Sequence, residues 1–158
     1  MNKKVFSLFF ALIFIIIGNI SAQENRGYVK STFSVGTTIL DLTEDYSENL
    51  AALAFDVDFV NIYGLTVGLH TLQAFNINIP PFSFVSFGIG YTFSSSNLSI
   101  GGKIMAVPYR NGGIGIDING TYWINEYMGF TGIFNYYISL ASIKWNNLSA
   151  RIGISCKI

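Results

Sequence analysis

The 158-residue sequence has little charge. Only 11% of its residues are Asp, Glu, Lys or Arg, and their formal net charge is zero. An ordinary soluble domain carries about 25% charged residues, so this sequence has too few charged residues for a conventional water-exposed surface. Balanced charge also provides no basic patch, which argues against nucleic acid as a partner. Hydrophobic residues make up 51% of the chain instead, and aromatic residues 16%.

Cysteine and histidine each occur once, as Cys156 and His70. A single cysteine excludes an internal disulfide and fits a small apolar side chain in a strand. His70 lacks the Cys/His partners of a metal site, and no serine is singled out beside it for a hydrolase triad. We therefore expect no metal, no cofactor and no enzymatic activity, and we expect His70 to be hydrogen-bonded on a polar face.

Long hydrophobic runs are absent after residue 22. Before it, Lys3 and Lys4 precede the apolar stretch VFSLFFALIFIIIGNI, and Ala22 provides a small residue before a polar segment. This pattern predicts a signal peptide over 1–22 and a mature chain over 23–158. The alternative is an uncleaved membrane anchor. No later stretch reaches the ~18 apolar residues of a membrane helix.

Apolar residues recur with period two in eight runs separated by turn-like clusters, which predicts strands. The expected strands are 27–39, 50–60, 63–71, 83–94, 97–107, 113–124, 127–139 and 147–158. Short connections alternate with the longer segments 40–49, 72–81, 107–113 and 140–147. This alternation predicts an all-β fold, an eight-stranded antiparallel up-and-down transmembrane β-barrel with tight periplasmic turns and longer extracellular loops.

The two faces of the strands differ in chemistry. One face is apolar and free of charge, whereas the other carries Gly, Ser, Thr and about one ionisable group per strand. That polar face is too poorly charged for the surface of a soluble barrel, but it suits a crowded lumen. We therefore expect the apolar face to contact lipid. A secreted lipocalin-like ligand binder, with its faces reversed, is the alternative.

The inward ionisable groups are expected to form an ion-pair network that plugs the lumen. They are Lys30, Asp56, Asp58, Lys103, Asp117, Arg151 and Lys157. Hairpin geometry places Lys103 opposite Asp117 and puts Lys30 level with Asp58. It also places Lys157 beside Lys30 on closure, and Asp56 and Arg151 are expected to meet across the lumen. An eight-stranded barrel is only wide enough for side chains to fill its interior.

The long loops supply the expected contacts with a host or surface ligand, because loops are where surface proteins meet partners. The candidate residues are Asp41, Glu44, Asp45, Glu48, Arg110, Lys144 and Trp145.

The last residues, NLSARIGISCKI, alternate strictly and end on Ile158. With the strand count, the loop alternation and the aromatic residues near the tight turns, this segment resembles small eight-stranded outer-membrane proteins of the OmpA-transmembrane-domain, OmpX and OmpW type. That family pattern usually ends in Phe or Trp, so Ile158 departs from it. The resemblance implies a monomer inserted into bacterial outer-membrane lipid by the barrel-assembly machinery. It implies a structural or adhesive barrel, with a narrow OmpW-like channel for small solutes as the alternative.

Overall fold

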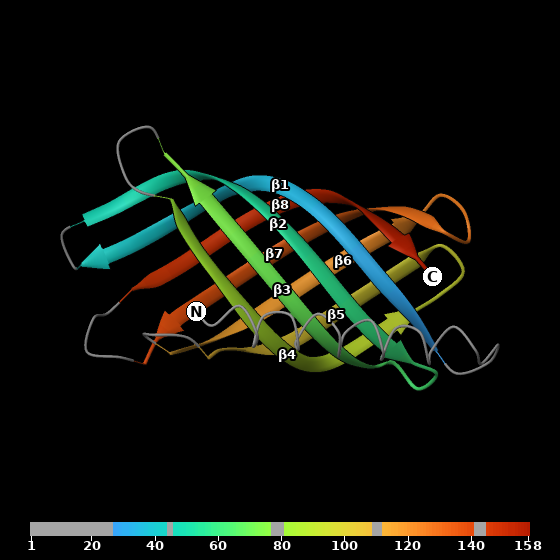
Figure 1. The fold of residues 1–158 in the computed structure, drawn as a ribbon. Helices are drawn as coiled ribbons and strands as arrows, with labels where there is room; N and C mark the ends of the chain where they lie inside the picture. Colours follow the sequence, from blue (N-terminus) through green and yellow to red (C-terminus); the bar gives the residue numbers. More distant parts are fainter. Residues whose placement is uncertain (1–26, 44–45, 77–80, 109–111, 141–144) are drawn as a thin grey trace, which may run out of the picture.

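The computed structural model describes residues 27–43, 46–76, 81–108, 112–140 and 145–158. These residues form eight strands: β1 (Gly27–Thr43), β2 (Tyr46–Asn61), β3 (Leu65–Phe75), β4 (Phe82–Ser94), β5 (Leu98–Val107), β6 (Gly113–Trp123), β7 (Met128–Ser139) and β8 (Asn146–Lys157). Each strand pairs antiparallel with the next, and β8 pairs with β1 to close the barrel (Figure 1). The prediction of an eight-stranded antiparallel up-and-down β-barrel is confirmed.

Alternation along the strands determines which side chains face outward, because successive residues of a strand point to opposite faces. In β6, Ile116 and Ile118 are exposed, while Asp117 between them is buried. Elsewhere on the outer surface, Ile104 is 69% exposed and Ile152 72%. The apolar face is therefore on the outside, which suits lipid and is the reverse of what a secreted lipocalin-like binder needs.

The two ends of the barrel differ in their connections. We call the end with connections 62–64, 95–97 and 124–127 the turn end, and the end with connections 44–45, 76–81, 108–112 and 140–145 the loop end. At the turn end, the Asn61 side chain accepts bonds from the backbone N–H groups of Tyr63 and Leu65. Gly64 there has a φ of 88°, a conformation that favours glycine.

The first two loops are shorter than the sequence predicts. Residues 40–43 and 46–49 belong to β1 and β2, with Asp41 opposite Ser47, and residues 72–75 belong to β3. The reason is that Leu40 and Leu50 continue the inward phase of their strands and are buried at 1% and 2% exposure. Polar neighbours in the sequence had suggested a loop, although the apolar alternation continues through it.

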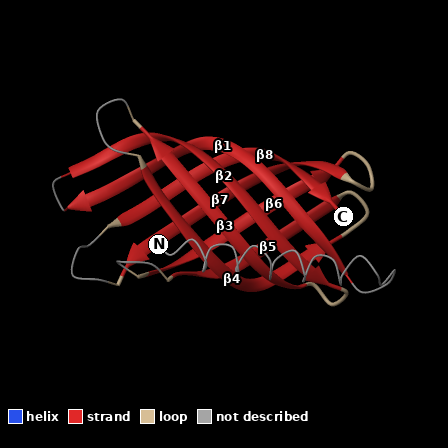
Figure 2. Ribbon diagram, in the orientation of Figure 1, coloured by secondary structure: helices blue, strands red, loops and turns tan. Residues whose placement is uncertain are grey.

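Strands and their connections account for the whole of the described chain, and the strands are strongly tilted (Figure 2). Among these residues, no helix has the length and hydropathy needed to cross a membrane.

Candidate functional site

Four buried charged side chains form a cluster in the lumen, on the turn-end side of its middle. We call Lys30, Asp58, Lys103 and Asp117 the ionic cluster. Nζ of Lys103 lies 2.5 Å from Oδ1 of Asp58 and 3.5 Å from Oδ1 of Asp117, and Nζ of Lys30 lies 3.5 Å from Oδ2 of Asp58. The expected registers hold, because Lys30 pairs with Asp58 and Lys103 with Asp117 across neighbouring strands. Each of the four is at most 4% exposed.

Two asparagines that the sequence analysis did not single out connect this cluster. Lys30 donates to Oδ1 of Asn119 over 2.7 Å, and Nδ2 of Asn119 donates to Asp117 over 2.8 Å. Asn135 donates to the other carboxylate oxygen of Asp117. Both asparagines occupy inward positions next to Asp117, two residues along β6 and directly opposite on β7. Their position in the inward phase of the strands could have identified them as lumenal. Because they carry no charge, nothing in the sequence indicated an ionic partner for them.

A second polar cluster lies at mid-height. Nδ1 of His70 donates to Oδ1 of Asp56 over 2.5 Å, and Nη1 of Arg151 lies 3.6 Å from Oδ2 of the same carboxylate. Arg151 also donates to Ser34 over 3.0 Å and to Asn135. His70 therefore has the hydrogen bond expected of it, and its partner Asp56 lies directly opposite it across β2 and β3. The two clusters meet at Asn135, so the described lumen contains one continuous network.

A glycine makes room for the ionic cluster. A Cβ atom at Gly68 would lie 2.3 Å from Oδ1 of Asp58 and 3.1 Å from Nζ of Lys103. Atoms cannot approach this closely without displacement. The contact between Asp58 and Lys103 therefore requires a residue without a side chain at position 68.

A cluster of apolar side chains, which the sequence analysis did not predict, lies in the loop-end half of the lumen beside buried polar residues such as Thr38 and Asn147. Its buried residues are Leu40, Leu50, Ala52, Ala54, Leu72, Ala74, Phe84, Met105, Val107, Tyr137 and Trp145; we call them the apolar cluster. Phe84 packs edge-on against Tyr137 with ring centroids 4.8 Å apart. The ring of His70 stacks on Tyr137 at 6.1 Å, so His70 lies at the boundary between the polar and apolar halves.

Lys157 lies apart from the network. It pairs in register with Lys30, as expected, but its Nζ is 4.3 Å from the ring centroid of Tyr28 and 5.4 Å from that of Trp123. Lys157 thus contacts aromatic rings at the turn-end mouth. The buried charges that remain in the network are balanced, with Lys30, Lys103 and Arg151 against three aspartates.

The residues expected to contact a partner are dispersed. Asp41 and Glu48 lie on strands, and Glu48 accepts a hydrogen bond from Asn76 over 3.0 Å. Trp145 is 6% exposed and packs against Phe84 inside the barrel, so its ring does not lie on the surface. Glu44, Asp45, Arg110 and Lys144 lie outside the described residues.

The packed clusters leave little free space. The gap lined by the ionic cluster, Asp56, Asn119 and neighbouring side chains is too narrow to admit a water molecule. Within the described ranges, no group of three or more His, Cys, Asp or Glu residues could hold a metal ion. The arrangement neutralises the buried charges of the ionic cluster.

Comparison with known proteins shows a likeness in fold only. No protein-family description matches the chain, and no curated protein matches its sequence. Neisserial surface protein A matches with a TM-score of 0.63 and 12% identity, over 84% of this chain and 97% of that one. Ail of Yersinia pestis matches with a TM-score of 0.59 and 10% identity, over 86% and 100%. The chain has the fold of small outer-membrane β-barrels. A de novo designed transmembrane β-barrel is also similar, with a TM-score of 0.60 and 14% identity, over 86% and 98%.

Proposed function

We propose that the protein is a non-enzymatic barrel of the bacterial outer membrane, with a structural or adhesive role and a lumen closed to solutes. The observation that carries this proposal is the continuous network from Lys30 to Arg151, in which every charged side chain is buried and has an opposite charge within 4 Å. Unpaired buried charge is costly, so a network balanced in this way favours a permanent plug over a pore that opens.

Residues 1–22 are proposed as the signal peptide that directs the chain out of the cytoplasm, leaving 23–158 as the mature protein. The barrel-assembly machinery would then insert it as a monomer, with the turn end towards the periplasm. Two features support this orientation. The turn-end connections are tight, and exposed aromatic residues such as Tyr63 and Phe93 ring that end, as in the interfacial girdles of outer-membrane barrels.

The loop end is the proposed surface for a host or surface ligand. Ail, which has the same fold, has been crystallised in complex with the heparin analogue sucrose octasulfate. For this chain we propose that Arg110 and Lys144 contact an anionic ligand. Sulfates and carboxylates pair well with Arg and Lys. Binding of sucrose octasulfate to the folded barrel should therefore weaken in an Arg110→Ala/Lys144→Ala variant, and equal binding by both proteins would contradict this part of the proposal.

Conductance of the purified barrel in planar bilayers tests the closed lumen. We expect no single-channel steps from the wild-type protein. The same preparation should show faster gel mobility before boiling than after, and it should precipitate without detergent. Regular conductance steps from protein that passes both checks would overturn the closed lumen, whereas solubility without detergent would overturn the membrane barrel itself.

A narrow channel for small apolar solutes is the second candidate, and the apolar loop-end half of the lumen favours it. Against it, Leu72 and Tyr137 are completely buried and fill that half. Uptake of an apolar solute into proteoliposomes by the wild-type barrel, enhanced in Trp145→Ala, would favour this candidate over the plug.

A further inference from the structure

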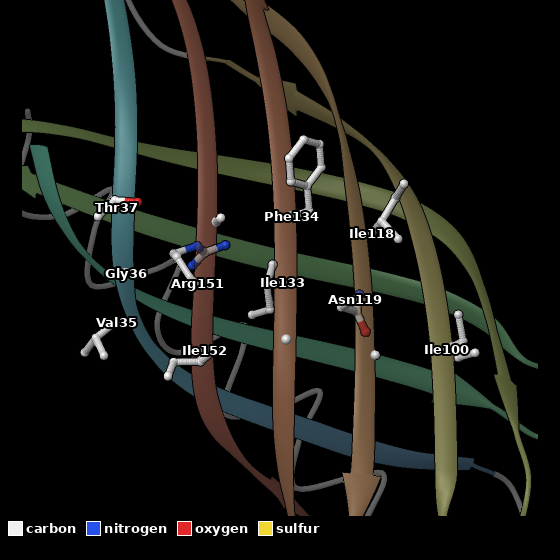
Figure 3. Close-up of a pocket in the computed structure, with 13 residues that line it drawn as sticks. Val35, Gly36, Thr37, Ile100, Ile118, Asn119, Ile133, Phe134, Arg151 and Ile152 are labelled. Atoms are coloured by element: carbon white, nitrogen blue, oxygen red, sulfur yellow. The ribbon is translucent and has the colours of Figure 1, made fainter. Parts of the chain in front are cut away.

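The outer wall of the barrel contains a groove of about 620 Å³, lined by residues of β5, β6, β7, β8 and β1. Its floor is formed by Gly120, Gly132 and Ala150, and in Figure 3 Ile118 and Phe134 lie on one side of it, with Ile100 and Ile152 on the other. Arg151 also borders the groove, but its guanidinium bonds Ser34 and Asn135 in the lumen. The side chains that face the groove from outside are therefore apolar or small.

Gly120 and Gly132 have no evident role within the chain. They pair directly across β6 and β7, and a Cβ atom at either would meet nothing within 4 Å. In contrast, a Cβ at Gly68 or Gly115 would collide with its neighbours. Among the described glycines, only Gly27 and Gly64 have a positive φ. Glycine weakens a strand interior and often marks a place where another molecule approaches the backbone.

The surroundings of the groove select a thin apolar occupant. Phe130 (60% exposed), Ile152 (72%) and Tyr122 (57%) stand out beside the glycines. A second barrel presents a convex wall, which these side chains would hold away from the glycine floor. A single side chain of such a neighbour would fill only part of the volume. The groove opens within the charge-free outer face, where the surrounding medium is lipid hydrocarbon.

We propose that this groove is a binding site for one acyl chain of a membrane phospholipid, with Gly120 and Gly132 as its floor. The inference rests on the proposed membrane location. The chain lies against the glycine backbone, bounded by Ile118 and Phe134 on one side and by Ile100 and Ile152 on the other. Contact with the exposed backbone and these walls holds this chain longer than the lipids around the remainder of the barrel.

The test uses the folded barrel in vesicles of phosphatidylethanolamine containing a photoreactive diazirine midway along one acyl chain. Peptide mass spectrometry then maps the cross-links. We expect them to be concentrated in residues 113–135 and 148–153 in the wild-type protein. A Gly120→Leu/Gly132→Leu variant fills the groove and should lose this concentration. The matched control, Gly102→Leu/Ala106→Leu, adds nearly the same bulk, one carbon less, to exposed positions of β5 that do not line the groove, and should retain the wild-type pattern.

Cross-links spread evenly over all eight strands in the wild type would overturn the proposal, as would an unchanged pattern in the groove-filling variant. A cross-link between two copies of the chain at this face, lost in that variant, would identify a second barrel as the occupant and would also overturn it. Heat-dependent gel mobility verifies that each variant is folded. If the leucine variant does not fold, Gly120→Ala/Gly132→Ala takes its place. None of these cross-linking outcomes contradicts the proposed function. The proposed function is contradicted only if the barrel conducts ions or is soluble without detergent.

Discussion

Towards the turn end, the lumen is filled by Lys30, Asp58, Lys103 and Asp117, held by ion pairs and asparagine amides. Towards the loop end, the same tube is filled by Leu72, Met105, Tyr137 and other apolar side chains. The two halves are packed by different physical means. The ionic half depends on particular partners, because a buried charge without its counter-charge is strongly unfavourable. The apolar half depends on volume, which several combinations of side chains could provide.

The largest effect is expected from Lys103→Met, which removes a cation contacting two buried aspartates. Breaking a buried ion pair from one side costs about 3–5 kcal/mol, so the free energy of unfolding in urea should fall by roughly that amount. The double variant Lys103→Met/Asp117→Asn removes both charges, leaves Lys30 paired with Asp58, and should recover a large part of the loss. If the single variant is as stable as the wild type, the ionic half does not depend on charge pairing.

Next in size is Leu72→Ala, in the apolar half. Leu72 is completely buried, and large-to-small substitutions of buried leucine cost about 2–5 kcal/mol. Urea unfolding should show this loss, and Leu72→Met should restore most of it, because that swap conserves volume and costs less than about 1.5 kcal/mol. A Leu72→Met variant as unstable as Leu72→Ala would show that shape, as well as volume, is specified in this half.

A pair of glycine substitutions compares the two halves directly. In Gly68→Ala the new methyl group meets the Asp58 carboxylate at 2.3 Å, whereas in Gly88→Ala it meets the sulfur of Met105 at 2.1 Å. Methionine is flexible and can move aside, but the carboxylate is fixed by two lysines. We expect Gly68→Ala to lose about 1–3 kcal/mol of stability and Gly88→Ala to lose less. The reverse order in urea unfolding would contradict the contrast between a fixed and an adaptable half.

The smallest effect is expected from Lys157→Gln. Lys157 contacts the rings of Tyr28 and Trp123 and lies outside the ionic cluster. Cation–π contacts at such sites contribute about 0.5–1 kcal/mol, well below the loss expected for Lys103→Met. A loss as large as that of Lys103→Met, measured in the same unfolding experiment, would instead place Lys157 within the network.

Much of the ionic half could be predicted from the sequence, because period-two alternation determines the inward phase and hairpin symmetry determines the register. Lys103 and Asp117 are equally distant in sequence from the middle of the connection 108–112, so a symmetric hairpin places them face to face. The positions of Asn119 and Asn135 follow from the same phase, but uncharged amides give no reason in the sequence to expect a partner.

The apolar half could not be predicted in the same way. Leu40, Leu50 and Leu72 lie in or beside segments whose polar residues suggested loops, so they were not counted as inward positions. Trp145 precedes the start of β8 and could equally have pointed outward. Its burial against Phe84 depends on long-range packing, which the local pattern does not contain. The groove at Gly120 and Gly132 likewise depends on residues from five strands.

The pairing of β8 with β1 is the step that closes the barrel wall. Lys30 lies opposite Lys157, and the backbone of Val29 exchanges hydrogen bonds with Ile158 in both directions. The contact that closes the ring therefore joins segments separated by almost the whole described chain, and contacts of such long range form slowly. Until they form, β1 and β8 each present an unpaired edge capable of joining another chain. The newly made protein must therefore be protected from association with other copies of itself until residues 146–158 have been synthesised and have paired with β1.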